Sequence, residues 1–227
     1  DVYKRQLFVK LCVIGGAGAR SAFLTKSLVK STRDIRVDHI VLLDNDQQKL
    51  KTYGEISREL SRRLDPDLTF EVTSDARAAL TGVDYIITTI RAGGDAGRLF
   101  DEQTCLAHGV LGQETTGAGG FAMAIRSVPT LVYYCTLARE VANPGHLIFN
   151  FTNPSGIITQ ALRSKGFDNV YGICDAPSGF IKQLEEILEI PYGTLDIECY
   201  GLNHLSWFRN AKVNGRDVQR ELLDNPR

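Results

Sequence analysis

Short apolar runs and amphipathic stretches alternate along most of the chain. The run VDYIITTI (residues 83–90) is apolar on both faces, which is typical of strands in parallel sheets that helices cover on both sides. The stretch KLKTYGEISRELSRRL (residues 49–64) instead carries its apolar residues at helical spacing. Strand and helix patterns alternate six times before Ile190. The sequence therefore predicts an α/β fold with a Rossmann-like, doubly wound and mostly parallel sheet.

The pattern changes after Ile190. The stretch LDIECYGLNHLSWFRNAKVNGRDV predicts strands, and Asn214-Gly215 within it is typical of a two-residue hairpin turn. We expect a Rossmann-like domain at residues 7–190, followed at residues 191–227 by the beginning of a second, α+β domain. The chain does not begin with Met and stops at LLDNPR, so we interpret it as a fragment.

One segment between these patterns is rich in glycine. LGQETTGAGGFAMAIRS (residues 111–127) holds four glycines around a Gln-Glu pair, and we expect this part to be too loose for a helix. It is either a flexible loop under a ligand or a structural crossover. A helix is predicted to follow, with Pro129 near its start, and we interpret Arg126 as a solvated charge. Asp75 is predicted to cap a short helix.

Composition narrows the class of protein. Hydrophobic residues make up 43% of the 227 residues and charged residues 23%, as in soluble globular proteins. The net charge of -1 gives no bulk attraction to nucleic acid or anionic membranes, and no uninterrupted apolar run is long enough to span a membrane. The N-terminus shows no signal-peptide pattern. Five irregularly spaced cysteines argue against a disulfide framework and for a cytoplasmic, reducing location.

The stretch VIGGAGARS predicts a dinucleotide site, because it follows a strand and opens a helix. Gly16, Gly18 and Ser21 occupy the places of the G-x-G-x-x-G/A fingerprint, and Gly15 precedes them. Glycines let the backbone approach a pyrophosphate, and the helix N-terminus supplies amide donors. Asp44 ends the second strand, where a carboxylate binds the ribose hydroxyls of NAD in preference to NADP. The alternative interpretation is a tight turn with no ligand.

Four later segments end in polar residues with useful chemistry. Arg91 follows the VDYIITTI strand, Asn153 the LIFNF strand, Cys174 and Asp175 the VYGI strand, and His204 lies in CYGLNHLSW. Ligands of open α/β sheets bind beyond the carboxyl ends of the strands, so we expect these residues at one edge. Each also has a structural interpretation: a surface salt bridge, a turn before proline, a buried core thiol, a helix cap and a core histidine.

A thiolate and an imidazole are good ligands for a divalent transition ion, which makes Cys174 and His204 candidates for a metal site. Two protein ligands leave coordination positions open, which suits a substrate with vicinal oxygens. No C-x-x-C partner is present, so the spacing is not that of a structural zinc site.

Taken together, the motifs VIGGAGARS, LLDND, IRAGG, GVLGQETTGAGG, NFTNPSG, GICDAPSG and YGLNHLSWF resemble glycoside hydrolase family 4. The resemblance runs from about Val9 to the C-terminus, with the motifs in the family's order. It implies that residues 7–190 are the NAD-binding domain and residues 191–227 the truncated beginning of the catalytic domain. It implies an NAD- and metal-dependent glycosidase, in a family that includes 6-phospho-α-glucosidases, 6-phospho-β-glucosidases and α-galactosidases. Hydrolysis would then proceed by oxidation at the sugar C3, elimination across C1 and C2, addition of water and re-reduction, without two flanking carboxylates.

The resemblance also implies roles for the polar residues. Cys174 and His204 correspond to the ligands of a divalent ion, usually manganese. Asp175 corresponds to the general acid that protonates the leaving oxygen, and it favours the α-glucosidase branch, because many β-active members carry Asn there. Asn153 corresponds to a contact to a sugar hydroxyl, and Arg91 to an arginine on the substrate side. The expected substrate is a small phosphorylated glucoside, and a homodimer or homotetramer is the expected assembly.

The chain departs from the family in length, because members are about twice as long. The catalytic tyrosine base lies in the half that is missing, and Tyr200 matches a different motif. Asp1 to Gln6 match nothing in the family and are interpreted as foreign sequence. We therefore expect this fragment to bind NAD without turnover. Two alternatives remain: an NAD-dependent hydroxy-acid dehydrogenase with His204 as base and Arg91 as carboxylate clamp, and a non-catalytic dinucleotide or sugar-phosphate sensor.

Overall fold

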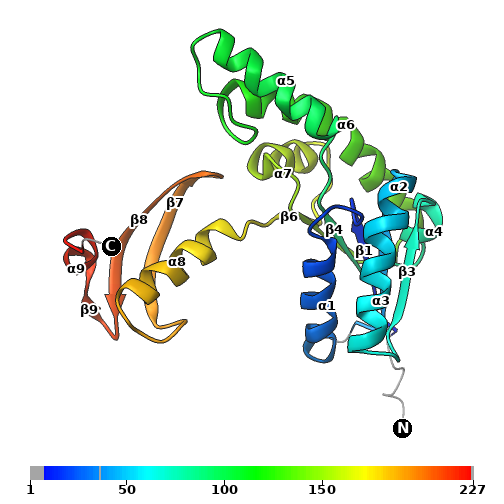
Figure 1. The fold of residues 1–227 in the computed structure, drawn as a ribbon, viewed down its shortest axis with the longest axis horizontal. Coiled ribbons are helices and arrows are strands. Elements are labelled where there is room, and N and C mark those ends of the chain that lie inside the picture. Colours follow the sequence, from blue (N-terminus) through cyan, green and yellow to red (C-terminus); the bar gives the residue numbers. More distant parts are fainter. Residues whose placement is uncertain (1–7, 36, 226–227) are drawn as a thin grey trace.

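The computed structural model of the chain describes residues 8–35 and 37–225 (Figure 1). The residues predicted to be foreign lie outside the described residues. Helices and strands alternate in the order β1 (Lys10–Ile14), α1 (Ser21–Ile35), β2 (His39–Leu43), α2 (Gln47–Lys49), η1 (Leu50–Gly54), α3 (Glu55–Leu64), β3 (Thr69–Thr73), α4 (Ala76–Leu80), β4 (Tyr85–Thr88), α5 (Gly94–Ala107), α6 (Gly117–Val141), β5 (Leu147–Asn150), α7 (Ser155–Ser164), β6 (Val170–Gly172), α8 (Ala176–Ile187), β7 (Leu195–Leu202), β8 (Leu205–Val213), β9 (Arg216–Asp217) and α9 (Gln219–Leu223).

Within the described residues, six parallel strands form one sheet in the order β3-β2-β1-β4-β5-β6. The strand order reverses between β1 and β4, which is the switch point at which open α/β sheets bind ligands. The predicted Rossmann-like sheet is therefore confirmed. The predicted cap is present as well, since the Asp75 side chain accepts a hydrogen bond from Ala78 N at 3.0 Å.

The apolar strands are buried because helices cover both faces of this sheet. On β1, Leu11 and Val13 face a cluster that includes Val29 of α1, while Cys12 and Ile14 face a second cluster. That second cluster contains side chains of α4, α6 and α7. Alternate residues of one strand thus enter two cores, which explains why the run shows no polar face.

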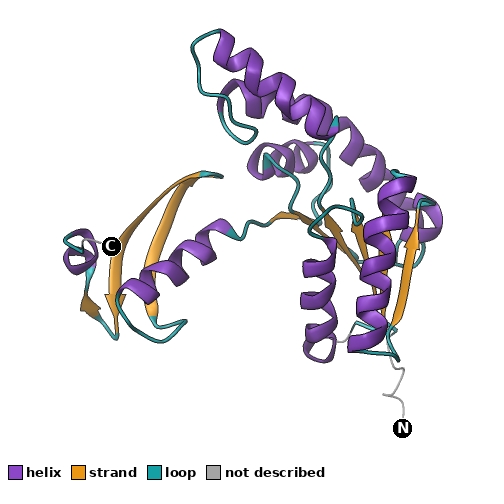
Figure 2. Cartoon of the chain, in the orientation of Figure 1, coloured by secondary structure: helices purple, strands orange, loops and turns teal. Residues whose placement is uncertain are grey.

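The C-terminal strands form a separate antiparallel sheet in the order β7-β8-β9 (Figure 2). Asn214 and Gly215 have φ values of 51° and 81°, so the predicted hairpin turn is confirmed. Leu195 and Ala211 of this sheet pack against Ile181 of α8 in a third apolar cluster. The domain boundary at residue 190 stays a prediction. Helix α8, which ends before that residue, already packs in the third cluster with the C-terminal sheet.

The helix expected over residues 49–64 is confirmed, although it begins two residues earlier, at Gln47, and contains the π-helical turn η1. The prediction that the glycine-rich segment is too loose for a helix is wrong from Gly117 onward. The glycine-rich segment starts α6 at Gly117, so Pro129 lies inside that helix instead of near its start. Helix α5 was not expected at all.

Helices α5 and α6 lie side by side and extend beyond the sheet (Figure 1). Among the described residues, α6 is also the one helix that is long and apolar enough to match a membrane span by length and composition. Its C-terminal half supplies Leu131, Cys135 and Ala138 to the core of the sheet.

Candidate functional site

The glycine-rich turn after β1 lies at the switch point of the sheet. Gly15 has a φ of 82°, and the amides of Gly15 and Gly16 donate to Leu43 O at 2.8 and 3.0 Å. A Cβ atom on Gly15 would lie 2.8 Å from Thr89 C, so the fold itself requires glycine there. A Cβ atom on Gly18 would meet nothing closer than 4.0 Å. The packing of the protein does not require that glycine, which fits a turn that must admit a ligand.

Asp44 follows β2 and holds the same turn. Its Oδ2 accepts from Ala17 N at 3.1 Å, and its Oδ1 accepts from Asp46 N at 3.0 Å. The carboxylate therefore fixes the loop that would surround the pyrophosphate, and its remaining lone pairs can accept from ribose hydroxyls. The turn, the start of α1 and Asp44 together fit a dinucleotide.

Arg91 lies just beyond β4 and is paired with two carboxylates. Its guanidinium contacts Asp95, and its Nη2 donates to Glu114 Oε1 at 3.3 Å. Arg98 of α5 donates to Glu102 at 2.8 Å and lies 3.7 Å from the other oxygen of Glu114. No pattern in the sequence pointed to Arg98, and Glu114 stood out only as part of the Gln-Glu pair of the glycine-rich segment. Glu114 lies between two arginines and is shielded, with 18% of its side chain exposed, so both cations are held at one place.

Arg126 is not the solvated charge that the sequence suggested. It forms an ion pair with Asp101, whose side chain is 5% exposed, and its Nε donates to Ala92 O at 3.1 Å. A Cβ atom on Gly93 would lie 3.0 Å from Arg126 Nε, so the guanidinium packs directly on the turn after Arg91. Arg126 therefore fixes that turn to α6.

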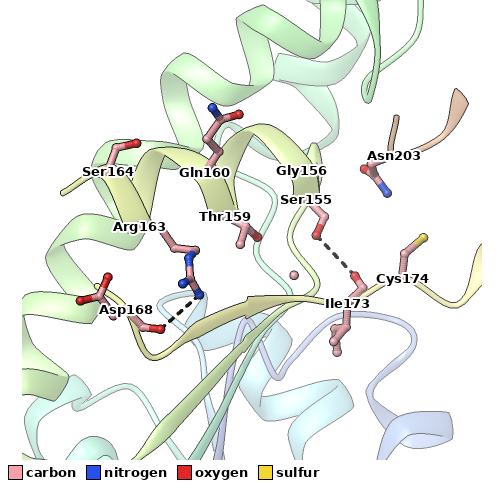
Figure 3. A pocket seen from close by; sticks show the side chains of 11 residues that line it. Ser155, Gly156, Thr159, Gln160, Arg163, Ser164, Asp168, Ile173, Cys174 and Asn203 are labelled. Carbon is pink, nitrogen blue, oxygen red and sulfur yellow. Dashed lines mark hydrogen bonds between the residues drawn. The ribbon is translucent and has the colours of Figure 1, made fainter. Parts of the chain in front are cut away.

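A cavity of about 720 Å³ lies between α7 and the end of β6. Figure 3 shows Cys174 and Asn203 at one end of this cavity and Arg163 and Asp168 at the other. Cys174 is half-buried, whereas burial raises the pKa of Cys12 to about 12. Of these two thiols, Cys174 is the one placed to meet a ligand.

Asp175 and Asn153 lie within two residues, along the chain, of residues that line this cavity. Asp175 occupies the N-cap position of α8, but its exposed side chain makes no capping hydrogen bond. The structure therefore does not show the helix-capping hydrogen bond that was one interpretation of Asp175. Asn153 is half-buried and precedes Pro154 through a cis peptide bond, in the loop between β5 and α7.

His204 comes from the second sheet and not from the end of a parallel strand. It lies with Asn203 in the two-residue turn between β7 and β8, where it is exposed with a φ of 60°. Exposure argues against a core histidine. A Cβ atom on Gly156 would lie 3.5 Å from Asn203 Cβ, so this hairpin tip contacts the start of α7. Asn203 lines the same cavity as Cys174.

The donor set fits a metal ion only in part. Within residues 8–35 and 37–225, no group of three or more His, Cys, Asp and Glu side chains is arranged to hold a metal ion. Cys174 and the hairpin tip with His204 approach one cavity, and the buried Asn203 Oδ1 has no hydrogen-bond partner among the described residues. A soft thiol beside unpartnered polar groups suits an exchangeable divalent ion that also takes ligands from a substrate. The roles predicted for these residues stay predictions.

Comparison with known proteins identifies the family. A profile described as "Family 4 glycosyl hydrolase" matches residues 10–190. The chain belongs to family 4 of the glycosyl hydrolases. The resemblance noted in the sequence is therefore confirmed.

One curated relative and two solved structures are informative. The 6-phospho-beta-glucosidase BglT of Thermotoga maritima is 35% identical over 96% of this chain and 51% of its own length. A crystal structure of a 6-phospho-alpha-glucosidase from gut microorganisms, in complex with NAD and Mn²⁺, has a TM-score of 0.89 at 31% identity over 95% of this chain and 50% of that protein. A structure of the 6-phospho-beta glucosidase from Thermotoga maritima with manganese, NAD⁺ and glucose-6-phosphate has a TM-score of 0.87 at 32% identity, over 96% and 52%. The chain spans about half the length of the curated relatives it matches.

Proposed function

We propose that the complete protein containing this chain hydrolyses O-glycosidic bonds of 6-phosphorylated glucosides, with NAD and a divalent ion, manganese in preference, as cofactors. The observation that carries the proposal is the combination of two sites in a family 4 chain. One is a glycine turn whose Gly18 is open to a ligand, and the other is a cavity that Cys174 and the His204 hairpin approach. Similar proteins have been crystallised with NAD, manganese and glucose-6-phosphate.

Two groups of residues in this chain would hold the two cofactors. The turn at Gly15 to Gly18 and the carboxylate of Asp44 bind and orient NAD. Cys174 and His204 hold the divalent ion. When bound, NAD exchanges a hydride with the sugar ring, and the ion acts as a Lewis acid on the sugar oxygens.

Three further residues act on the sugar itself. Asn153 binds a ring hydroxyl, and Arg91 faces the substrate from the end of β4. Asp175 donates a proton to the leaving oxygen, and its carboxyl makes no capping hydrogen bond that would compete. Arg91 is already held by Asp95 and Glu114, so a phosphate would have to displace a carboxylate or bind the remaining donors.

We favour α-glucosides as substrates because Asp175 stands where many β-active members carry Asn. The relatives include both types, with the α enzyme the better structural match and the β enzyme the more identical sequence. We also propose that the 227-residue chain binds NAD without turnover, and that the protein is cytoplasmic and assembles as a homodimer or homotetramer. The five cysteines, all unpaired in the structure, support a reducing compartment.

The test is an assay of the complete protein on p-nitrophenyl 6-phospho-α- and β-glucosides with NAD, Mn²⁺ and a thiol reductant. We expect nitrophenol release that EDTA abolishes and Mn²⁺ restores. Cys174→Ser is expected to lose activity, whereas Cys199→Ser, on the exposed face of β7, is the matched control. Activity that persists in EDTA rejects the proposal. NADH formation from hydroxy acids, without a metal, establishes the dehydrogenase instead. Saturable NAD binding with no turnover of any substrate indicates a sensor.

A further inference from the structure

A buried cluster of side-chain hydrogen bonds joins the ends of β4, β5 and β6 beneath the cavity. Its centre is Asn150, the last residue of β5, which is fully buried. Thr88 and Thr152 are each 1% exposed, and Ser155 is 4% exposed. Burying polar side chains costs free energy unless each one is hydrogen-bonded. A hydrogen-bonded polar cluster in the interior therefore requires an explanation.

Asn150 uses both ends of its amide. Its Oδ1 accepts from Thr88 Oγ1 at 2.8 Å and from Thr152 N at 3.2 Å. Its Nδ2 contacts Thr159 Oγ1 at 3.1 Å, Ser155 O at 3.3 Å and Thr152 O at 3.4 Å. One side chain thus binds β4, the loop that contains Asn153, and the first two turns of α7.

The network extends to the residue before Cys174. Ser155 Oγ lies 3.4 Å from Ile173 O (Figure 3). It also lies 3.1 Å from Asn150 O, to which Ile173 N donates at 3.0 Å. A Cβ atom on Gly172 would lie 2.7 Å from Thr159 Oγ1, so β6 approaches α7 as closely as glycine allows. Cys174 therefore starts from a backbone that Asn150, Ser155 and Thr159 fix.

We propose that Asn150 is a positioning residue: it sets the mutual placement of Asn153 and Cys174, and so the geometry of the divalent-ion and sugar site. The inference rests on the proposed function, which assigns the ion to Cys174. Asn150 touches neither ligand. Its side chain acts through the loop after β5 and through Ser155 and Thr159, which contact Ile173 and Gly172; the bond from Ile173 N goes to the main-chain carbonyl of Asn150 and remains in Asn150→Ala. The glycine turn of the NAD site is held by hydrogen bonds to Leu43 and Thr89, and none of the side-chain hydrogen bonds that Asn150 makes with the described residues goes to that turn.

The arrangement predicts that ion binding and NAD binding respond differently to changes in the network. In Asn150→Ala, we expect Mn²⁺ affinity to fall by about 10–100-fold, as for other outer partners of metal ligands. NAD affinity should change by less than about twofold, because the nucleotide turn shares no partner with Asn150. A purely structural role would weaken both ligands together through loss of folded protein.

The experiment measures Mn²⁺ binding by electron paramagnetic resonance and NAD binding by calorimetry on the complete protein, with Tm from circular dichroism. Thr159→Val removes one acceptor at constant shape, and Thr159→Ser retains it. Val83→Ala, in the core beneath α4 and fully buried, is the control for loss of stability alone. If Asn150→Ala does not fold, the Thr159 pair carries the test.

We expect the Mn²⁺ affinity to fall in Asn150→Ala and Thr159→Val but not in Thr159→Ser or Val83→Ala. Mn²⁺ affinities equal to that of the wild type in both network variants would overturn the inference while leaving the proposed function intact. Parallel losses of Mn²⁺ and NAD, matching those of Val83→Ala at equal loss of Tm, would also overturn it. A wild-type protein that binds no Mn²⁺ removes the proposed function and the inference with it.

Discussion

Replacing Arg126 by methionine removes the cation beside a buried carboxylate. Asp101 would keep 5% exposure of its side chain and lose its ion pair, and Ala92 O would lose a hydrogen bond. Breaking a fully buried pair costs about 3–5 kcal/mol. Because the Arg126 side chain is 31% exposed, water can reach the site, and we take about 2 kcal/mol for the pair. The lost hydrogen bond adds about 1 kcal/mol.

The expected loss of about 3 kcal/mol corresponds to a fall in Tm of about 6–12 °C for a chain of this size. The assay is unfolding by urea and by heat, followed by circular dichroism, with the urea m-value checked for constancy. Arg77→Met is the matched control, since the Arg77–Glu140 pair has side chains that are 62% and 55% exposed. That pair contributes at most about 1 kcal/mol.

The double variant Arg126→Met/Asp101→Asn sharpens the test. It removes the unpaired charge, so it should be at least about 1 kcal/mol more stable than Arg126→Met alone. A loss in Arg126→Met no larger than in Arg77→Met would refute the reasoning, as would a double variant less stable than the single one. The turn after Arg91 should also loosen, which predicts lower activity of the complete protein in Arg126→Met than in Arg77→Met.

Three further predictions concern the nucleotide turn and the thiols. Gly18→Ala should fold as the wild type does, because the added methyl group meets open space in the protein without ligand. It should bind NAD at least about tenfold more weakly in calorimetry, a loss of about 1.4 kcal/mol, because the methyl group would occupy space that the pyrophosphate needs. Unchanged NAD affinity would be evidence against the site. Gly16→Ala should lower Tm even without NAD, because its Cβ atom would lie 2.9 Å from Leu42 Cβ, and a normal Tm would contradict that packing. In alkylation followed by mass spectrometry, Mn²⁺ with NAD should protect Cys174 but not Cys199; equal protection, or none, would count against Cys174 as a ligand.

The sheet and the nucleotide turn could be predicted because their signals are local. The central strands β1, β2 and β4 supply apolar side chains to the clusters on both faces of the sheet, and Asn214-Gly215 adopts the left-handed conformations that its residue types favour. Gly15, which precedes the fingerprint residues, likewise has the positive φ that glycine favours in a tight turn. In these segments, intrinsic preference and tertiary packing agree.

The start of α6 could not be predicted, because packing overrides preference there. Glycine has low helix propensity, so four glycines indicated a loop. In the structure, a Cβ atom on Gly120 would lie 2.7 Å from Thr115 C, and one on Gly119 would collide with Gln113 O. The glycines allow the preceding turn to approach the helix. Arg126 was misjudged because its partner Asp101 lies in α5, a helix that the sequence pattern did not reveal.

The place of His204 depends on contacts between units that are far apart in sequence. The sequence suggested that His204 lies at the same sheet edge as the other polar residues, but the pairing of Leu202 with Leu205 places it at a hairpin tip of the second sheet. The tip reaches the cavity through Asn203, which lines it and approaches Gly156, and no local pattern encodes that approach. The hydrogen bonds of Asn150 were missed likewise, because Asn150 and Thr88 are 62 residues apart.

The central claim is that NAD and a divalent ion ligated by Cys174 face the same sugar. Anomalous scattering from Mn²⁺, in crystals of the complete protein grown with NAD and glucose 6-phosphate, tests it most directly. We predict a single strong peak within bonding distance of Cys174 Sγ and His204, in contact with sugar oxygens beside the nicotinamide ring. A peak remote from that sulfur, or from the nicotinamide, would contradict the account.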